Sequence, residues 1–222
     1  MFTWIETVQT AFPYIIEGSL YTMGIVVAAM FCGLALGVPM ACALVYGPKP
    51  LRRLIQLYVW FFRGMPVLVL FFLFYFGLFA IIGFDMSPFT AAWTVLGLCS
   101  AAYQSQIFRG AIEAVHQGQL KAAKALGMSQ TQGIIYIVLP QALRHSLPAW
   151  SNEYSIVLKD SAVAFVLGTT EIMARTHFVA SRTYEHLPLY ALAACIYFVL
   201  TWIGVKSLVA LEKKTRIPGY QQ

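Results

Sequence analysis

The run SLYTMGIVVAAMFCGLALGVPMACALVY, residues 19–46, carries no charged side chain. A helix that crosses a lipid bilayer needs about 20 mostly apolar residues, and this run exceeds that length. Its glycines, among them Gly24, Gly33 and Gly37, would let neighbouring helices approach closely in lipid. The Gly47-Pro48-Lys49-Pro50 segment that follows is a strong signal for the end of a helix. Residues 19–46 therefore predict a transmembrane helix that packs tightly against others.

The composition of the whole chain agrees with a membrane protein. Of the 222 residues, 59% are hydrophobic and 11% are charged, whereas a soluble domain carries roughly 25% charged residues. The length favours a single domain. The net charge of +6 comes from basic residues in loops, and no basic run with interleaved aromatics is present. We therefore expect membrane lipid around the chain and no nucleic-acid partner.

Four further segments predict helices that span the membrane: 54–82, 90–112, 148–173 and 187–211. Within the second of the five spans, Gly64-Met65-Pro66 would kink or restart the helix. The fourth is the least apolar, because it contains four charged residues: Glu153, Lys159, Asp160 and Glu171. The predicted fold class is an all-α membrane protein with five transmembrane helices, which form one transmembrane domain over residues 18–212.

The distribution of Lys and Arg orients the predicted helices. Most of these residues follow the first and third spans or lie near the end of the chain: Lys49, Arg52, Arg53, Arg109, Lys121, Lys124, Arg144, Lys206, Lys213, Lys214 and Arg216. Cytoplasmic loops are rich in Lys and Arg. We therefore expect residues 1–17 outside the cytoplasm and the basic tail, 213–222, inside it, which requires an odd number of spans. Residues 1–17 contain no Lys or Arg, so the first span is expected to remain as an anchor rather than to be cleaved as a signal peptide.

The cytoplasmic loop at 118–140 has the pattern of two short helices around a glycine. Residues 118–126 are good helix formers, and Gly127 stands where a C′ glycine would end that helix. Ser129 and Gln132 match a capping box, which would start a second helix. Such a knob could seat in a groove of a partner, or it could be an ordinary surface loop. The pattern alone leaves both interpretations open.

The same loop resembles the EAA loop of ABC-importer permease subunits. That motif reads E-A-A, three residues, G, nine residues, I-x-L-P, and the spacing is matched throughout, with Lys121 in place of the usual Glu. The matching residues are Lys121, Ala122, Ala123, Gly127, Ile137, Leu139 and Pro140. In that family the knob docks on a separate ATPase. The resemblance therefore implies that these residues couple the chain to an ATPase.

Four other segments resemble the polar amino acid uptake permeases of the histidine, glutamine and arginine type: 63–69, 103–110, 151–153 and 158–161. The resemblance implies the permease subunit of a type I ABC importer, a multi-pass protein of the bacterial cytoplasmic (inner) membrane. Its expected partners are two copies of an ATP-binding subunit, a second permease subunit that is identical or homologous, an extracytoplasmic solute-binding protein and an amino acid cargo.

The energy source is expected to lie on a partner. The sequence has no Walker A loop, G-x-x-x-x-G-K-[ST], so the chain is not expected to bind ATP in that way itself. We expect a transport subunit that is not an enzyme and carries no cofactor of its own, with ATP–Mg bound to the ATPase subunit.

Charged side chains inside a bilayer are rare and usually functional. Glu153 and Asp160 are seven residues apart and would lie on one face of a helix. They would suit the side chain of arginine, lysine or histidine, or the α-ammonium group of any amino acid. Alternatively, Asp160 pairs with Lys159, and Glu153 lies among the headgroups. The other candidate cargo-binding residues are polar: Ser100, Tyr103, Asn152 and Ser161. For Ser100 and Tyr103, hydrogen bonding between helices is the alternative.

Other functions have less support. The four cysteines form no CxxC pair and the histidines lack metal-ligand spacing, so no metal site is expected. Arg63, near the start of the second span, is interpreted as an anchor at the cytoplasmic interface. The alternative function is an ion-coupled secondary amino acid transporter, which would contain inverted repeats that we do not find. A membrane enzyme would need a nucleophile–base pair or a metal cluster, and neither is recognisable.

Overall fold

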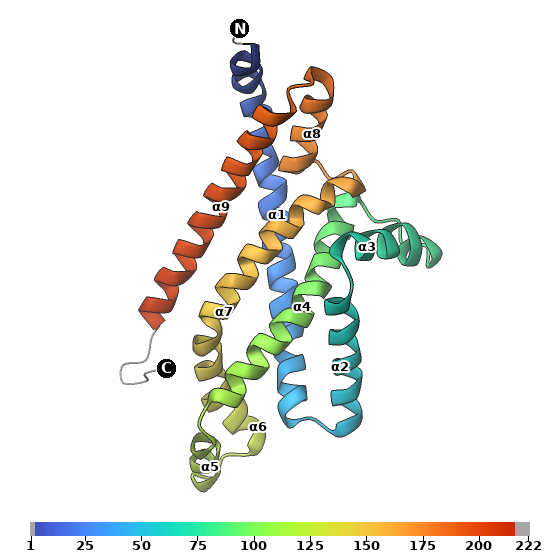
Figure 1. Cartoon of the computed structure of the whole chain (residues 1–222). Coiled ribbons are helices and arrows are strands. Elements are labelled where there is room, and N and C mark those ends of the chain that lie inside the picture. Colours follow the sequence, from blue (N-terminus) through green and yellow to red (C-terminus); the bar gives the residue numbers. More distant parts are fainter. Residues whose placement is uncertain (1–2, 216–222) are drawn as a thin grey trace.

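The computed structural model describes residues 3–215, in which every regular element is a helix (Figure 1). The predicted all-α class is confirmed. The elements are α1 (Thr3–Tyr46), α2 (Lys49–Gly64), α3 (Val67–Phe72), the π-helix η1 (Leu73–Phe79), α4 (Pro88–Ala114), α5 (Gln117–Ala125), α6 (Gln130–Gly133), the π-helix η2 (Ile134–Val138), α7 (Leu139–Asp160), the 3-10 helix η3 (Ser161–Leu167), α8 (Ile172–Thr183) and α9 (His186–Thr215). Of the predicted basic tail, residues 216–222 lie outside the described part.

Helix α1 is longer than the predicted first span. It begins at Thr3, so nearly all of the predicted N-terminal segment, 1–17, belongs to the same helix. At 1.5 Å per residue its 44 residues extend about 65 Å, roughly twice the hydrocarbon thickness of a bilayer. The first part of α1 packs against α8 and the start of α9, where Ile15, Ile172 and Leu189 are fully buried. This N-terminal end of the molecule therefore has a hydrophobic core of its own.

The segment predicted as the second span, 54–82, is broken in two. Helix α2 begins at Lys49, five residues before the predicted start, and α3–η1 leaves it at an angle of 109°. The break follows from the sequence, because Met65 adopts an extended conformation before Pro66, which cannot continue a helix from its preceding residue. Figure 1 shows α2 running beside α4 and α3 turning away above it.

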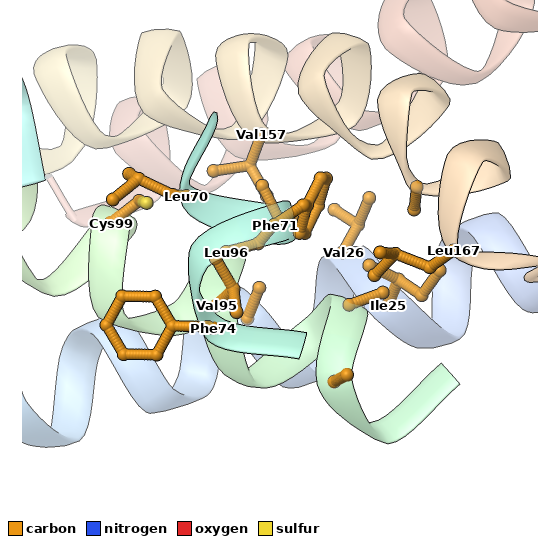
Figure 2. Close-up of a cluster of buried hydrophobic side chains, with 14 of the residues drawn as sticks. Ile25, Val26, Leu70, Phe71, Phe74, Val95, Leu96, Cys99, Val157 and Leu167 are labelled. Atoms are coloured by element: carbon orange, nitrogen blue, oxygen red, sulfur yellow. The ribbon is translucent and has the colours of Figure 1, made fainter. Parts of the chain in front are cut away.

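The main core lies where α3 meets three other helices. Leu70 and Phe71 of α3 are fully buried, as is Val26 of α1. Figure 2 shows these side chains grouped with Leu96 of α4 and Val157 of α7. Because the chain turns at Pro66, the apolar residues of α3 are directed between α1, α4 and α7. The turn therefore joins the helices that carry the candidate site.

The fourth predicted span, 148–173, differs at both ends from the helix that the structure contains. Helix α7 begins at Leu139 and ends at Asp160, η3 continues to Leu167, and Met173 belongs to α8. Residues 130–160 form one continuous helical path, because Pro140 does not interrupt it. A proline removes one helical hydrogen bond and crowds the preceding turn. The wider π turn of η2, immediately before, provides the space.

Two single helices in the described part of the chain are long and apolar enough to cross a membrane: α1, over Trp4–Tyr46, and α9. The bent pair of α2 with α3–η1 would make a third. Helix α4 agrees closely with the predicted span 90–112, and α9 with the predicted span 187–211. Helices α4 and α7 do not reach the same apolarity, because they carry more polar side chains. The count of five spans and the orientation of the chain stay predictions.

Candidate functional site

Glu153 and Ser100, two predicted cargo-binding residues, are in direct contact. The hydroxyl of Ser100 on α4 donates to Oε1 of Glu153 on α7 over 2.7 Å. Both side chains are buried, with exposures of 1% for Ser100 and 3% for Glu153. The interaction joins α4 to α7, as the helix–helix alternative for Ser100 predicted. It also holds a carboxyl group among helices, so Glu153 does not lie at the surface of the chain.

Gln104 links this pair to a third helix. Its amide nitrogen donates to Ser100 Oγ over 3.0 Å and to the carbonyl oxygen of Met30 on α1 over 3.1 Å. Its amide oxygen accepts from the indole nitrogen of Trp150 over 2.9 Å. An indole N–H can only donate, so it directs the amide group of Gln104 towards Ser100. Ser100 then has its own hydrogen free for Glu153.

The network depends on a glycine of the first span. A Cβ at position 33 would overlap the amide nitrogen of Gln104, so only glycine lets this side chain lie between α1 and α4. Sequence reasoning did not single out Gln104 or Trp150 as functional residues. A signal was available for Gln104, because it lies one helical turn after Ser100 and faces the same way. Trp150 has no such signal, since its partner is 46 residues away.

Tyr103 on α4, another predicted cargo-binding residue, packs against Arg63. The guanidinium carbon of Arg63 lies 4.8 Å from the centre of the Tyr103 ring, and the Arg63 side chain is also within electrostatic range of the Glu153 carboxyl group. The interpretation of Arg63 as an interfacial anchor stays a prediction. Because α2 begins at Lys49, and not at the predicted residue 54, Arg63 lies in its last turn, at the far end from the connection to α1.

The remaining predicted cargo-binding residues are more dispersed. Asp160 is half-buried at the end of α7, within electrostatic range of both Glu153 and Lys159. Ser161 is fully buried and donates to the carbonyl oxygen of Leu158 over 2.7 Å, so its hydroxyl is satisfied locally. Asn152 is exposed. It lies about 100° around the helix from Glu153, so the structure does not bring it into the Ser100–Glu153 group.

A second buried glutamate, Glu171, has a different environment. Its carboxylate accepts from the backbone nitrogens of Met173 over 2.8 Å and Ala174 over 2.6 Å, and from the hydroxyl of Tyr197 over 2.6 Å. Glu171 is therefore the N-cap of α8, tied to α9. Within residues 3–215, no group of three His, Cys, Asp or Glu side chains could hold a metal ion.

The loop over 118–140 folds locally as predicted. Gly127 has φ +82°, the left-handed conformation expected of a C′ glycine. Ser129 and Gln132 form the capping box: Ser129 Oγ accepts from the Gln132 nitrogen over 3.2 Å, and Gln132 Oε1 from the Ser129 nitrogen over 2.8 Å. At the start of α5, Nδ1 of His116 accepts from the Gly118 nitrogen. The knob is therefore defined by its own hydrogen bonds.

The predicted coupling residues divide into inward and outward groups. Ala123 is buried against Gly133 inside the knob, whereas Lys121, Ala122 and Gly127 are exposed. Ile137 and Leu139 are half-buried, and Pro140 is exposed. The sequence interpretation passed over Leu126, which is 83% exposed at the tip.

The comparisons with known proteins agree with this architecture. Residues 33–217 match the family described as "Binding-protein-dependent transport system inner membrane component". The chain belongs to this family. The predicted resemblance to amino acid ABC permeases is thereby confirmed, and the family description refers to an inner membrane component.

Two relatives of this inner membrane component extend over almost the whole chain. The arginine transport system permease protein ArtQ of Bacillus subtilis is 35% identical over 92% of this chain and 93% of its own. The putative glutamine transport system permease protein GlnP of Rickettsia conorii is 33% identical over 96% of this chain and 98% of its own. A solved amino acid ABC transporter with histidines matches with a TM-score of 0.84 and 32% identity, over 96% of this chain and 99% of the other.

Proposed function

We propose that this chain is the membrane-spanning permease subunit of an ATP-driven importer for polar amino acids. Two such subunits, identical or homologous, would form the path, with two copies of an ATP-binding subunit in the cytoplasm and a solute-binding protein outside. The family assignment and the relatives named for arginine and glutamine support this proposal. The chain would cross the inner membrane five times, with its N-terminus outside. ATP–Mg would bind to the partner ATPase, and this chain would have no ATPase site of its own.

The observation that carries the cargo proposal is the buried carboxyl group of Glu153. An ionised carboxylate can accept about four hydrogen bonds, and within the described part of the chain Glu153 accepts one, from Ser100. A buried acid that is incompletely hydrogen-bonded is costly unless a cation or another donor joins it. The ammonium group of an amino acid supplies both a positive charge and three donors. Asp160 would extend the negative potential towards the end of α7.

The proposal for energy coupling rests on the knob over 118–140. Its apolar tip, with Leu126 and Ala122 exposed, suits a groove on the ATPase. Lys121 is exposed beside it, where the family motif usually has an acid. Closure of the ATPase subunits would then move the knob, and with it the continuous helical path through α6, η2 and α7 that carries Glu153. Cargo binding and ATP hydrolysis would be linked through that path.

Uptake into proteoliposomes tests the proposed function. The chain is reconstituted with and without its ATPase and binding protein, and labelled arginine and glutamine are supplied with ATP or with an ion gradient. We expect uptake only with the complete complex and ATP. Uptake on an ion gradient alone would support a secondary transporter instead. Equal competition by arginine, lysine and glutamine, unchanged in Glu153→Gln and Asp160→Asn, would exclude selection of cationic side chains by this chain.

A pair of variants at Gly127 tests the knob. Valine is strongly disfavoured in the left-handed conformation, whereas asparagine tolerates it. We expect Gly127→Val to weaken assembly with the ATPase or to uncouple ATP hydrolysis from uptake, and Gly127→Asn to retain most of both. Co-purification and the ratio of amino acid imported to ATP hydrolysed measure the two effects. Coupled uptake at the wild-type level in Gly127→Val would exclude the docking role.

A further inference from the structure

Arg63 lies in the last turn of α2, far from Lys49 at the start of that helix, and its side chain is exposed. It follows Lys49 by 14 residues on α2, which corresponds to about 21 Å along the helix axis. Glu153 follows Leu139 by 14 residues on α7, which again corresponds to about 21 Å. Both helices rise from the end of the molecule that carries the knob (Figure 1). The two opposite charges therefore lie at a similar height along the bundle. Under the proposed function this height is within the membrane, where a charged side chain is costly and usually functional.

The guanidinium group of Arg63 is held in place but is not neutralised. One face stacks on Tyr103 at 4.8 Å, and Tyr103 lies one turn from Ser100, the residue that binds Glu153. In the described part of the chain, no acidic group forms an ion pair with Arg63. The ion pair found there joins Arg175 and Glu17. Stacking occupies a face of the group and leaves its N–H donors, which lie in the plane, available for a ligand.

We propose that Arg63 binds the α-carboxylate of the amino acid cargo, opposite Glu153, which receives the α-ammonium group. This inference rests on the proposed function and specifies what the site recognises. A guanidinium group matches a carboxylate with two parallel hydrogen bonds. A cationic side chain and an anionic side chain that are near each other but unpaired are complementary to a zwitterion. They are not complementary to a cation alone. The site therefore recognises the part that all amino acids share, and the cargo's side chain is selected elsewhere.

The difference in burial between the two residues also implies an order of binding. Arg63 is exposed in this conformation, whereas Glu153 is covered by its contact with Ser100. The carboxylate of the cargo meets Arg63 first. The ammonium group reaches Glu153 when α4 and α7 move apart, which is the kind of movement that alternating access requires.

The test compares amino acids with amines that lack only the carboxylate. The permease–ATPase complex is purified in lipid nanodiscs without the binding protein, which has its own specificity. Arginine is compared with agmatine and histidine with histamine, and the readout is the concentration that gives half-maximal ligand-induced thermal stabilisation. Charge-assisted hydrogen bonds contribute a factor of about ten to one hundred. We expect the wild type to prefer each amino acid by that factor.

Substitution of Arg63 should remove the preference by weakening binding of the amino acid alone. Arg63→Gln is expected to bring the ratio close to one, and Arg63→Lys to retain part of it, because lysine keeps the charge but not the planar fork. Arg53→Gln is the matched control, since Arg53 is exposed near the start of the same helix, and it should retain the wild-type ratio. Should Arg63→Gln fail to assemble, Tyr103→Leu removes the stacking partner and is expected to reduce the ratio severalfold.

The outcomes separate this inference from the proposed function. An unchanged ratio in Arg63→Gln, or in Tyr103→Leu where Arg63→Gln does not assemble, excludes the carboxylate role while ATP-driven uptake by the wild type still stands. A wild type that binds amine and amino acid equally also excludes it. Absence of ATP-driven amino acid uptake by the complete wild-type complex would instead reject the proposed function, and this inference with it.

Discussion

Glu153 and Glu171 are both buried glutamates, yet their surroundings differ in the number and origin of the donors. Glu171 accepts three hydrogen bonds, two of them from backbone nitrogens within the next three residues. Among the residues that the structure describes, Glu153 accepts one, from a serine 53 residues away on another helix. A carboxylate with most of its acceptor positions filled stabilises the fold, whereas one with several free positions can bind a ligand. The contrast separates a structural acid from a candidate binding acid where burial alone would not.

The largest effect on stability is expected at Glu171. Glu171→Ala removes the N-cap of α8 and leaves the buried hydroxyl of Tyr197 without its acceptor. Together these losses should destabilise the protein by about 3 kcal/mol. Thermal unfolding in detergent, followed by tryptophan fluorescence, measures the change. Glu6→Gln, at an exposed position on α1, is the control and should unfold like the wild type. A variant Glu171→Ala as stable as this control would remove the contrast between the two glutamates.

An intermediate effect is expected at Glu153, on binding more than on stability. Glu153→Gln keeps an oxygen that can accept from Ser100 but removes the charge that would attract an ammonium group. We expect affinity for the cargo to fall about tenfold to one hundredfold, which corresponds to about 1.4 to 2.8 kcal/mol. Ligand-induced stabilisation of the permease–ATPase complex measures it. If Glu153→Gln lost stability as Glu171→Ala does and bound its cargo normally, Glu153 would be structural as well.

The smallest effect is expected at Trp150, which is three hydrogen bonds away from Glu153, through Gln104 and Ser100. Trp150→Phe keeps an aromatic ring but removes the donor that orients the amide group of Gln104. Gln104 can then rotate and compete for the hydrogen of Ser100, and we expect a loss of about 1 kcal/mol, or several-fold in cargo affinity. The same binding measurement detects it, with Trp202→Phe as the control, because Trp202 is 53% exposed on α9. Equal affinities in both variants would show that the network does not orient Glu153.

Features formed by residues close together in the sequence were predicted, whereas features formed by residues far apart were not. The capping box of Ser129 and Gln132 and the left-handed Gly127 were predicted correctly, because their partners lie within a few residues. The interruption at Gly64-Met65-Pro66 was also predicted, but its angle was not, because the buried contacts of Phe71 with other helices determine where α3 points. The start of α7 was placed nine residues too late, since hydropathy does not register a polar helix that continues through Pro140.

The candidate site was only partly visible in the sequence. Glu153, Asp160, Ser100 and Tyr103 were identified as polar residues in apolar surroundings, and the structure joins Ser100 to Glu153. Arg63 was interpreted as lying near the start of the second span, which was predicted to begin at residue 54. Helix α2 begins at Lys49 instead, so Arg63 lies in its last turn. Its stacking partner, Tyr103, lies on another helix, and no periodicity in either helix indicates that pair.

The sequence by itself determined the helical class, the apolar character of a membrane protein and the local structure of the knob, because these depend on composition and on hydrogen bonds between near neighbours. Its motifs indicated the family through their resemblance to those of known permeases. The tertiary structure decided which charges face one another and which are satisfied. Glu171 and Glu153 are the same residue type in neighbouring parts of the chain. Their different surroundings arise because the backbone beside Glu171 supplies two of its donors, while Ser100 reaches Glu153 from a helix that only packing brings near.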